Sequence, residues 1–527
     1  MDKLIPTISF IFFLIFLAPN KVANATTSPS SICSQTPYPE LCNSLTITPQ
    51  STLDDETSSS FNVRDASLKF TLAQAQYVHN LISTMDTTSF DKLSKAAWDD
   101  CLQLYEDTIN NLDRCSSSKN NLNDVQTWLS AAYANHETCK NGFIEFQLNS
   151  KLQSFPFFNT NFSKHLSNSL AINKASITSS LSASQTKNRK LLSLDSDGFP
   201  SWVSTGDRKL LQSSGAPKAN IVVAQDGSGN YKTISEALAA SSSQRSGSGR
   251  FVIYVKRGIY KENVVVTNSM TNIMMVGDGI DATVVTGSKN VVDGATTFNS
   301  ATFAVTGDNF IAQDMTFENT AGAAKHQAVA LRSGSDFSVF YRCSFKGYQD
   351  TLYVYSKRQF YRECDVYGTV DFIFGDAVVV FQSCNINLRQ PMSNQKNTVT
   401  AQGRSDPNEN TGIVIHNSQI SGSGVSVKSY LGRPWKEYSR TVIMKTGISS
   451  VIDPAGWLPW SGNFALDTLY YAEYANTGAG AGTSGRVNWA GYHVLTNAAD
   501  AQKFTVGNFL AGNSWIPSTG VPFTASL

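Results

Sequence analysis

The segment RCSFKGYQDTLYVYSKRQFYRECDVYGTVDFIFGDAVVVFQSCNINL, residues 342–388, contains a repeated phrase. The phrase occurs three times with a cysteine in the same slot, as RCSFKG (342–347), ECDVYG (363–368) and SCNINL (383–388). It occurs more loosely as DMTFEN (314–319) and NSQISG (417–422). Short β-rich runs broken by turns, repeating every twenty-odd residues, are typical of a parallel β-helix whose coils stack on one another. The repeat therefore predicts this fold for the segment and for the similar sequence around it.

The same period gathers polar residues that are far apart in the chain. Asp350 and Asp371 are 21 residues apart, which is one coil, so we expect them to be stacked neighbours about one strand spacing apart, ~4.8 Å. Gln349 adjoins Asp350, and Gln327 lies 22 residues before Gln349, one coil earlier. Polar ladders in a β-helix can also serve only to satisfy turns, so the repeat alone leaves a structural role open.

A stacked pair of carboxylates has a specific chemistry. Two such groups cannot both ionise easily, which favours one ionised nucleophile and one protonated acid. Neighbouring amides can donate N–H groups to an oxyanion, so the patch fits ester hydrolysis through an acyl-enzyme. A glycosidase also uses two carboxylates, but its cationic transition state needs amide donors less. A β-helix lyase or glycosidase that cleaves a polysaccharide backbone is the alternative.

The first 25 residues, MDKLIPTISFIFFLIFLAPNKVANA, have the pattern of a secretory signal peptide. Lys3 precedes an apolar run of roughly a dozen residues, shorter than the ~20 that a membrane span needs. An A-x-A end follows at Ala23–Ala25. We therefore expect a secreted protein without a membrane anchor, in which disulfides are permitted. The net charge of +1 argues against nucleic acid as a partner.

The remaining chain divides into three parts. Residues 26–183 carry apolar positions spaced by three and four, as in a helical bundle, and Asp124 looks like an N-cap of one helix. Residues 184–212 form a polar linker that contains RKLL twice, at 189–192 and 208–211, where a protease could cut. Residues 213–527 are β-rich, apart from a short helix expected in YKTISEALAAS (231–241). Asn161 begins an N-x-S sequon and is a candidate glycosylation site.

The eight cysteines split into five before the linker and three after it, so one thiol in each group can remain free. The coil register places Cys364 within disulfide range of both Cys343 and Cys384 and does not choose between them. The six histidines have no metal-ligand spacing.

Five motifs, in order and closely spaced, resemble plant pectin methylesterases over about 215–520. They are GIYKE (258–262), QAVALR (327–332), GYQDTLY (347–353), DFIFG (371–375) and LGRPW (431–435). The earlier segment LSAAYANHETC (129–139) resembles the pectin methylesterase inhibitor-like pro-region of that family. The RKLL phrases resemble the processing sites between the two parts.

The resemblance implies a right-handed parallel β-helix, preceded by an α-helical bundle, that removes methyl esters from homogalacturonan (pectin) in the extracellular cell wall. Asp371 would be the nucleophile, and Asp350 would protonate the leaving methanol and then activate water. Gln349 and Gln327 would hold the oxyanion. The bundle would inhibit or chaperone the enzyme before processing.

The resemblance also assigns supporting residues. Arg433 would hydrogen-bond Asp371 and keep it ionised, and Trp435 would stack on a sugar ring. Thr297 and Phe374, with Gln327 and Arg433, would contact the substrate. The implied disulfides are Cys364–Cys384, Cys33–Cys42 and Cys101–Cys139, which leaves Cys343 and Cys115 free. No cofactor or metal is implied, and the implied partners are methyl-esterified pectin, a processing protease at the RKLL sites and a proteinaceous inhibitor.

Overall fold

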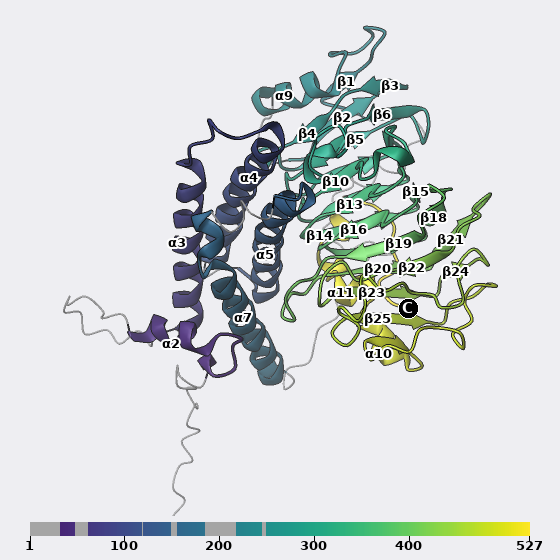
Figure 1. The fold of residues 1–527 in the computed structure, drawn as a ribbon. Helices are drawn as coiled ribbons and strands as arrows, with labels where there is room; N and C mark the ends of the chain where they lie inside the picture. The colour runs from purple at the N-terminus through teal and green to yellow at the C-terminus, as the bar shows by residue number, and fades with distance from the viewer. Residues whose placement is uncertain (1–31, 48–61, 118–119, 149–154, 185–217, 245–248) are drawn as a thin grey trace, which may run out of the picture.

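The computed structural model describes residues 32–47, 62–117, 120–148, 155–184, 218–244 and 249–527. A bundle of helices, coloured purple to blue, lies beside a stack of strands, coloured teal to yellow (Figure 1). The predicted signal peptide and both RKLL phrases lie outside the described residues. Within these residues, no helix combines the length and the apolar character needed to cross a membrane.

The helical half is an antiparallel bundle of long helices. Its members are α2 (Pro39–Ile47), α3 (Val63–Ser83), α4 (Lys92–Cys115), α5 (Leu122–Glu145), the short η1 (Pro156–Asn159) and α7 (Phe162–Ser184). The predicted apolar stripes are buried, as shown by Val78 in α3, Tyr105 in α4 and Leu129 in α5. The expectation that Asp124 caps a helix was wrong, because α5 is capped by Asn121, whose side chain accepts a hydrogen bond from Asn123 N–H.

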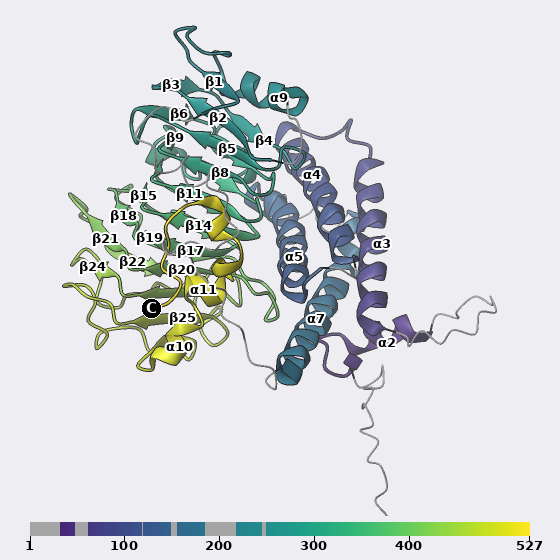
Figure 2. The same cartoon turned by 180° about the vertical axis from the view of Figure 1, so that it is seen from behind.

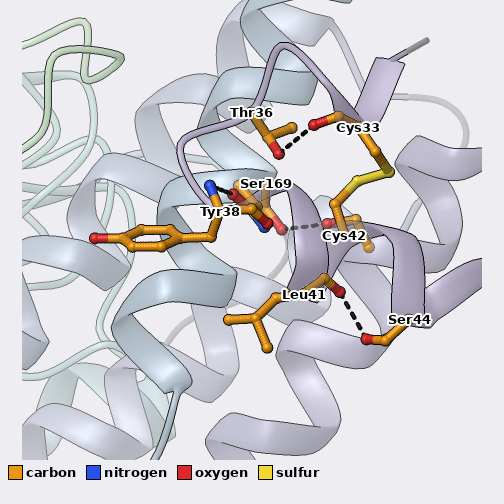
Figure 3. The surroundings of a disulfide bond; sticks show 9 residues. Cys33, Thr36, Tyr38, Leu41, Cys42, Ser44 and Ser169 are labelled. Atoms are coloured by element: carbon orange, nitrogen blue, oxygen red, sulfur yellow. Dashed lines mark hydrogen bonds between the residues drawn. A yellow bond between two sulfur atoms is a disulfide. The ribbon is translucent and has the colours of Figure 1, made fainter. Parts of the chain in front are cut away.

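Two disulfides join parts of the bundle. Cys33 and Cys42 are bonded, and Cys101 in α4 is bonded to Cys139 in α5, so both pairings predicted for this half are confirmed. Figure 3 shows the first disulfide at the end of the bundle, where Thr36 Oγ1 donates to the carbonyl of Cys33 across 2.8 Å. Cys115 is free and buried, as expected.

The strands form three parallel sheets of eleven, seven and eight strands, and the central coils contribute one strand to each sheet. Sheet 1 contains β4 (Val264–Val266), β7 (Phe303–Val305), β10 (Leu331–Ser333), β13 (Leu352–Val354), β16 (Ile373–Gly375), β19 (Asn397–Gln402) and β22 (Ser429–Gly432). Sheet 2 contains β1 (Ile221–Val223), β2 (Phe251–Val255), β5 (Ile273–Val276), β8 (Ile311–Gln313), β11 (Ser338–Tyr341), β14 (Arg358–Arg362), β17 (Val378–Gln382), β20 (Gly412–His416), β23 (Arg440–Met444), β25 (Tyr470–Tyr474) and β26 (Tyr492–Val494). Sheet 3 contains β3 (Gly258–Lys261), β6 (Thr283–Gly287), β9 (Thr316–Asn319), β12 (Ser344–Lys346), β15 (Asp365–Gly368), β18 (Asn385–Leu388), β21 (Gln419–Gly422) and β24 (Gly447–Ile448).

Short helices flank this stack. They are α9 (Ile234–Gln244), which confirms the helix expected in YKTISEALAAS, η2 (Phe298–Ser300), η3 (Ala323–Lys325), α10 (Ala498–Gln502), α11 (Val506–Phe509), η4 (Gly512–Ser514) and η5 (Ile516–Thr519). Figure 2 shows α10 and α11 in front of sheet 2, and their Ala501 and Val506 join an apolar cluster with Val380 and Val414 of that sheet.

The strand register confirms the repeat that was found in the sequence. Ser344 pairs with Asp365, and Asp365 pairs with Asn385, so the three cysteines that precede these residues occupy equivalent places in successive coils. Ser344 also pairs with Thr316, and Asn385 with Gln419, so the two looser phrases belong to the same ladder. The predicted parallel β-helix is therefore confirmed.

The interior of the β-helix is filled by equivalent side chains stacked from coil to coil. The rings of Phe340 and Tyr361 stack with centroids 4.7 Å apart, and Tyr361 and Phe381 stack at 4.5 Å. The implied disulfide Cys364–Cys384 is absent from the structure, because Cys343, Cys364 and Cys384 are all free thiols inside this core. The register aligns the three sulfurs equally, so it brings them close without selecting a pair.

The helical half covers the outer face of sheet 1. One apolar cluster continues from Leu104 and Leu129 of the bundle to Phe298, Tyr353 and Phe374 of the β-helix. Both views place α4 and α5 between the rest of the bundle and the strands (Figures 1 and 2). The outer face of sheet 1, which would otherwise be an exposed apolar surface, is therefore buried in this chain.

Candidate active site

Asp350 and Asp371 lie on adjacent rungs at the entrance to β13 and β16. Leu352 pairs with Ile373, so the two aspartates, each two residues earlier, are stacked at about one strand spacing, ~4.8 Å. Asp350 N–H also donates to the carbonyl of Val370 across 3.0 Å. Both aspartates have left-handed backbone, with φ values of 62° and 51°. Such a conformation is uncommon for a residue other than glycine, but in this chain it recurs at turns of other coils, for example at Arg342 and Glu363, so it is a feature of the coil and not of the site alone.

Asp371 is held in one orientation by its neighbours. Arg433 Nε donates to Oδ1 across 2.8 Å, and Arg433 Nη2 donates to Oδ2 across 2.7 Å. The hydroxyl of Thr398 donates to Oδ1 across 2.6 Å and accepts from the Asp371 N–H at 2.9 Å. The bidentate guanidinium and the hydroxyl donor together fix the orientation of this carboxyl group.

Asp350 has the opposite environment. Its side chain is buried, and burial is the largest cause that raises the pKa of Asp350 well above its ordinary value. The adjacent charge of Asp371 and that of Glu145 raise it further, while Arg433 partly offsets them. The two aspartates therefore differ in their surroundings, because Asp371 is paired with a guanidinium and Asp350 is buried without a cation of its own.

The two aspartates open into a cavity of about 220 Å³ between the halves of the chain. Six predicted site residues line it, namely Thr297, Gln327, Asp350, Asp371, Phe374 and Trp435. Arg433 reaches the site through its ion pair with Asp371. Gln349 does not line the cavity in this closed arrangement, and its side-chain oxygen accepts a hydrogen bond from Gln395 across 3.4 Å.

Aromatic rings form one wall of the cavity. Tyr353 and Phe374 are paired across adjacent strands, and their rings stack with centroids 4.1 Å apart. Trp435 meets Phe374 edge-on at 5.9 Å and lies against Gly403, where a Cβ atom would approach the indole to 2.9 Å. Trp460 lies under the Arg433 guanidinium, 4.4 Å from the ring centroid. Such a wall offers flat apolar faces for sugar rings.

Glu145, at the end of α5, enters the cavity from the helical half. Its two carboxylate oxygens accept hydrogen bonds from Thr297, one from the hydroxyl and one from the backbone N–H at 3.1 Å. Burial raises the pKa of Glu145. On α4, Asp100 accepts a hydrogen bond from Asn299, and burial raises its pKa to about 7.

Further polar contacts fasten the helical half outside the cavity. Lys436 Nζ donates to Glu137 of α5 across 2.8 Å. The Nε1–H of Trp128 donates to Asp336 Oδ2 across 3.0 Å, and Arg358 pairs with the same aspartate at 2.7 Å. The bonds of Lys436 to Glu137 and of Trp128 to Asp336 join the two halves.

Several of these residues had no signal in the sequence that would have identified them. Thr398 follows Asp371 by 27 residues, which does not match the coil period. Trp460 lies in an irregular segment after the repeats end, and Glu145 is one of many acids in the helical half. Tyr353 lies within the GYQDTLY motif and could have been chosen from its place opposite Phe374.

The chain combines a parallel β-helix, a buried aspartate pair in an aromatic cleft, and a helical bundle that covers the cleft. These three features define the class of protein to which it belongs. Comparison with known families agrees: residues 220–513 match the pectinesterase family, and residues 27–172 match the plant invertase/pectin methylesterase inhibitor family. The chain belongs to the pectinesterase family and carries an inhibitor-like domain before its β-helix.

Individual relatives match along nearly the whole chain. A probable pectinesterase/pectinesterase inhibitor 6 from Arabidopsis thaliana is 52% identical, covering 94% of this chain and 93% of the relative. Pectinesterase 2 from Citrus sinensis is 51% identical, covering 100% and 99%. The solved pectin methylesterase from carrot is 59% identical with a TM-score of 0.58, covering 60% of this chain and 100% of the carrot chain.

Proposed function

We propose that this pectinesterase hydrolyses the methyl esters of homogalacturonan through an acyl-enzyme on Asp371. The observation that carries the proposal is the paired environment of the two aspartates, one held by Arg433 and the other buried without a cation of its own. A nucleophile and an acid on adjacent rungs can act on the same ester group.

In the first step, an oxygen of Asp371 attacks the carbonyl carbon of the ester. The negative charge that develops on the carbonyl oxygen is stabilised by the side-chain amides of Gln327 and Gln349. Gln349 turns from Gln395 toward the substrate for this purpose. When the intermediate collapses, Asp350 gives its proton to the methoxy oxygen, methanol leaves, and an anhydride joins the sugar to Asp371.

In the second step, Asp350 is a carboxylate and acts as a base. It takes a proton from a water molecule, whose oxygen attacks the same carbonyl carbon. The bond to Asp371 breaks, Asp371 returns to its pair with Arg433, and the product is a free galacturonate unit. The site requires no metal or cofactor for any of these steps.

The substrate is recognised by the aromatic wall and by neutral donors. Trp435 and Phe374 present flat faces to sugar rings, and Thr297 presents its hydroxyl and its N–H to a carboxyl oxygen, as it does to Glu145. Product analysis tests the function. Methanol and new carboxylate should appear in equal amounts while the pectin chains keep their length, whereas shortened chains would indicate a lyase or glycosidase.

We infer that the helical half inhibits the β-helix until the linker is cut. Glu145 takes the donors of Thr297, and the bundle covers the aromatic wall on which a polysaccharide would lie. We further propose that the chain is secreted to the cell wall and is cleaved at an RKLL phrase. The exposed Asn161 would carry a glycan. A full chain that is as active as its isolated β-helix half would contradict the inhibitory role.

A further inference from the structure

Asp376 and Glu409 form a second pair of carboxyl groups, which the proposed mechanism does not use. Asp376 directly follows β16, and Glu409 belongs to loop 403–411, which joins β19 to β20. The two side chains are hydrogen-bonded to each other. Both residues are almost fully buried, with exposed fractions of 5% for Asp376 and 2% for Glu409. A buried contact between two acids needs a chemical explanation.

Other donors occupy one oxygen of each carboxyl group. They are the Gln402 amide and the Thr411 hydroxyl for Asp376 Oδ1, and the backbone N–H groups of Ser405 and Asp406 for Glu409 Oε1. All four donors belong to the β-helix half, so these bonds do not depend on the helical half. Glu409 Oε2 is buried and, among the described residues, receives no hydrogen bond from an N–H or O–H donor.

The bond between the two acids requires a proton. An ionised carboxyl group only accepts hydrogen bonds, so two carboxylates cannot bond to each other. A proton on Glu409 Oε2 supplies the missing donor and satisfies the oxygen that no other donor reaches. Burial raises the pKa of Glu409 well above its ordinary value, and the adjacent charge of Asp376 raises it further. The pair therefore holds one negative charge instead of two.

The neighbouring cations do not take the place of this proton. Arg404 Nε donates to the carbonyl of Glu409 across 3.0 Å, and Arg440 Nη1 donates to the carbonyl of Thr411 across 3.1 Å. In these bonds the guanidinium groups contact the backbone of the loop and not its acids. The other charged or titratable groups around the pair are Asp406, Tyr438, Lys436, Tyr353 and Tyr355 of the β-helix half, and Tyr133, Glu137 and Lys174 of the helical half.

Loop 403–411 lies directly behind the cleft wall. Gly403 N–H donates to the carbonyl of Gly375 across 2.8 Å, which ties the start of the loop to the end of β16. A Cβ atom on Gly403 would approach the Trp435 indole to 2.9 Å, so the ring packs on this residue. Asp376, Gly403 and Trp435 also line one small cavity. A contact that holds loop 403–411 therefore also supports Trp435.

The helical half adds its own contacts to the loop in the full chain. Lys174 Nζ of α7 donates to the carbonyl of Pro407 across 3.1 Å, and the Gln126 amide of α5 donates to the carbonyl of Asn408 across 2.7 Å. These contacts are lost when the helical half leaves, whereas the bonds of the acid pair remain. The pair is therefore expected to matter most in the free β-helix half.

We propose that Asp376 and Glu409 are positioning residues, which share one proton and thereby hold loop 403–411 against Trp435. The inference rests on the proposed function, because Trp435 offers a face for sugar rings there. Loss of the shared proton would leave two carboxylates in contact, and their repulsion would move the loop away from the indole. Substrate binding then weakens, whereas the bonds that hold Asp371 do not involve the loop.

Amide variants replace the shared proton by a fixed donor. In Glu409→Gln the new amide donates to the Asp376 carboxylate, and in Asp376→Asn it donates to the Glu409 carboxylate, so the pair keeps one negative charge. Glu409→Ala removes the bond. Glu363→Gln is the matched control, because it neutralises an exposed carboxylate just after β14, which pairs with Arg362 outside the cleft.

The test measures kcat and KM for methylated pectin between pH 5 and pH 9, with residues 213–527. The carrot enzyme, whose whole chain is matched by 60% of this one, indicates that such a half folds without the bundle. In wild type, KM should rise as pH rises through the raised pKa of Glu409. In Glu409→Gln and Asp376→Asn, KM should stay low throughout. In Glu409→Ala, KM should be raised about threefold to tenfold even at pH 5, as for the loss of one aromatic contact.

The control and kcat separate this effect from the titration of the catalytic pair. Glu363→Gln should follow wild type in both constants. The pH dependence of kcat that comes from Asp350 should persist in every variant, because only KM depends on the loop. Fluorescence of Trp435 adds a readout that does not need activity. This emission, taken as the difference from the same variant with Trp435→Phe, should change with pH in wild type and stay constant in Glu409→Gln.

The outcomes distinguish this inference from the function on which it rests. If wild type releases no methanol, the proposed function is wrong, and the Trp435 emission decides the inference. If wild type is active but its KM and its Trp435 emission depend on pH as those of Glu409→Gln do, the acids do not position the wall and the inference is overturned. Thermal unfolding checks that each variant is folded. If Glu409→Ala does not fold, the two amide variants, which keep the bond, still decide.

Discussion

The backbone N–H of Thr297 donates a hydrogen bond across 3.1 Å to Glu145, a residue of the helical half that lies 152 positions earlier in the chain. The bond places a carboxylate beside Asp350 and Asp371, in the cavity where a galacturonate carboxyl group would lie. The helical half thus contacts the candidate active site with a carboxyl group, which is chemically similar to the proposed substrate.

Asp350→Asn should remove the proton donor and keep the volume of the side chain. We expect kcat/KM for methyl esters to fall by about 10²- to 10⁴-fold, the range typical of a lost general acid. In wild type, kcat/KM should decline as pH rises through the raised pKa of Asp350, because only the protonated acid can assist the departure of methanol. The variant should lack this alkaline decline, and a decline that persists would assign it to another group.

Arg433→Ala should weaken catalysis because Asp371, the proposed nucleophile, is no longer held in its orientation. The change removes two strong hydrogen bonds and the charge partner of Asp371, so we expect kcat to fall about 10²-fold or more. Arg433→Lys restores the charge but not the bidentate geometry and should recover only part of the loss. Steady-state kinetics on methylated pectin measure both variants, and equal activity of the two would show that geometry is unimportant.

Glu137→Ala should weaken the hold of the helical half on the β-helix. The pair that Glu137 forms with Lys436 is largely buried, with both side chains 19% exposed. We expect the inhibition constant of the separate 27–183 segment against the 213–527 fragment to rise roughly 10- to 100-fold, because Lys436 loses its partner. Lys95→Ala, which removes an exposed pair with Asp99 within α4, is the control and should leave inhibition unchanged.

Inhibition by the helical half should weaken as the solution becomes less acidic. Burial raises the pKa of Asp100 to about 7 in the closed arrangement, above its ordinary value of 3.8. The closed form therefore binds a proton that the open form releases, so its stability declines as pH rises from about 4 to about 7. Glu137 acts in the opposite sense only below its ordinary pKa of 4.5.

The measurement for this pH effect is the inhibition constant between pH 5 and pH 7. It should increase at least about tenfold in wild type over this range. Asp100→Asn, which keeps a polar side chain opposite Asn299 but cannot ionise, should flatten the profile. If the inhibition constant of Asp100→Asn depends on pH as strongly as that of wild type, the pH dependence comes instead from Glu145 or Asp350, whose pKa values are also raised.

Removal of the Cys101–Cys139 disulfide should destabilise the helical half. The bond spans 38 residues and joins α4 to α5, the two helices that contact the cleft. A loop of this length predicts a loss of roughly 2–4 kcal/mol in the free energy of unfolding for Cys101→Ala with Cys139→Ala. Denaturant unfolding of the 27–183 segment measures it, and an unaffected midpoint would show that packing alone holds the two helices.

The sequence predicted those features that repeat with the coil. Asp350 and Asp371 are one period apart, so their stacking followed from counting residues, as did the shared slot of Cys343, Cys364 and Cys384. Thr398 escaped detection because the segment before β19 lengthens that coil to 27 residues and breaks the period. The disulfide predicted from the family was wrong, because Cys364 and Cys384 are both free thiols in the structure.

Contacts between the two halves had no periodic signal at all. Glu145 and Lys436 belong to different folding patterns, and only packing brings Glu145 to Thr297 and Lys436 to Glu137. Asp124 had the composition of a helix cap, yet the helix begins earlier and Asp124 pairs with Arg358 across the interface instead. Residues that act across an interface are therefore the part of the site that required a structure.

Methanol release from highly methylated pectin by residues 213–527, measured beside Asp371→Ala, tests the central claim most directly. We expect rapid release by the wild-type fragment and a loss of at least about 10³-fold in the variant, with the fold unchanged by circular dichroism. A folded Asp371→Ala variant that still releases methanol at a comparable rate would contradict the assignment of Asp371 as the nucleophile.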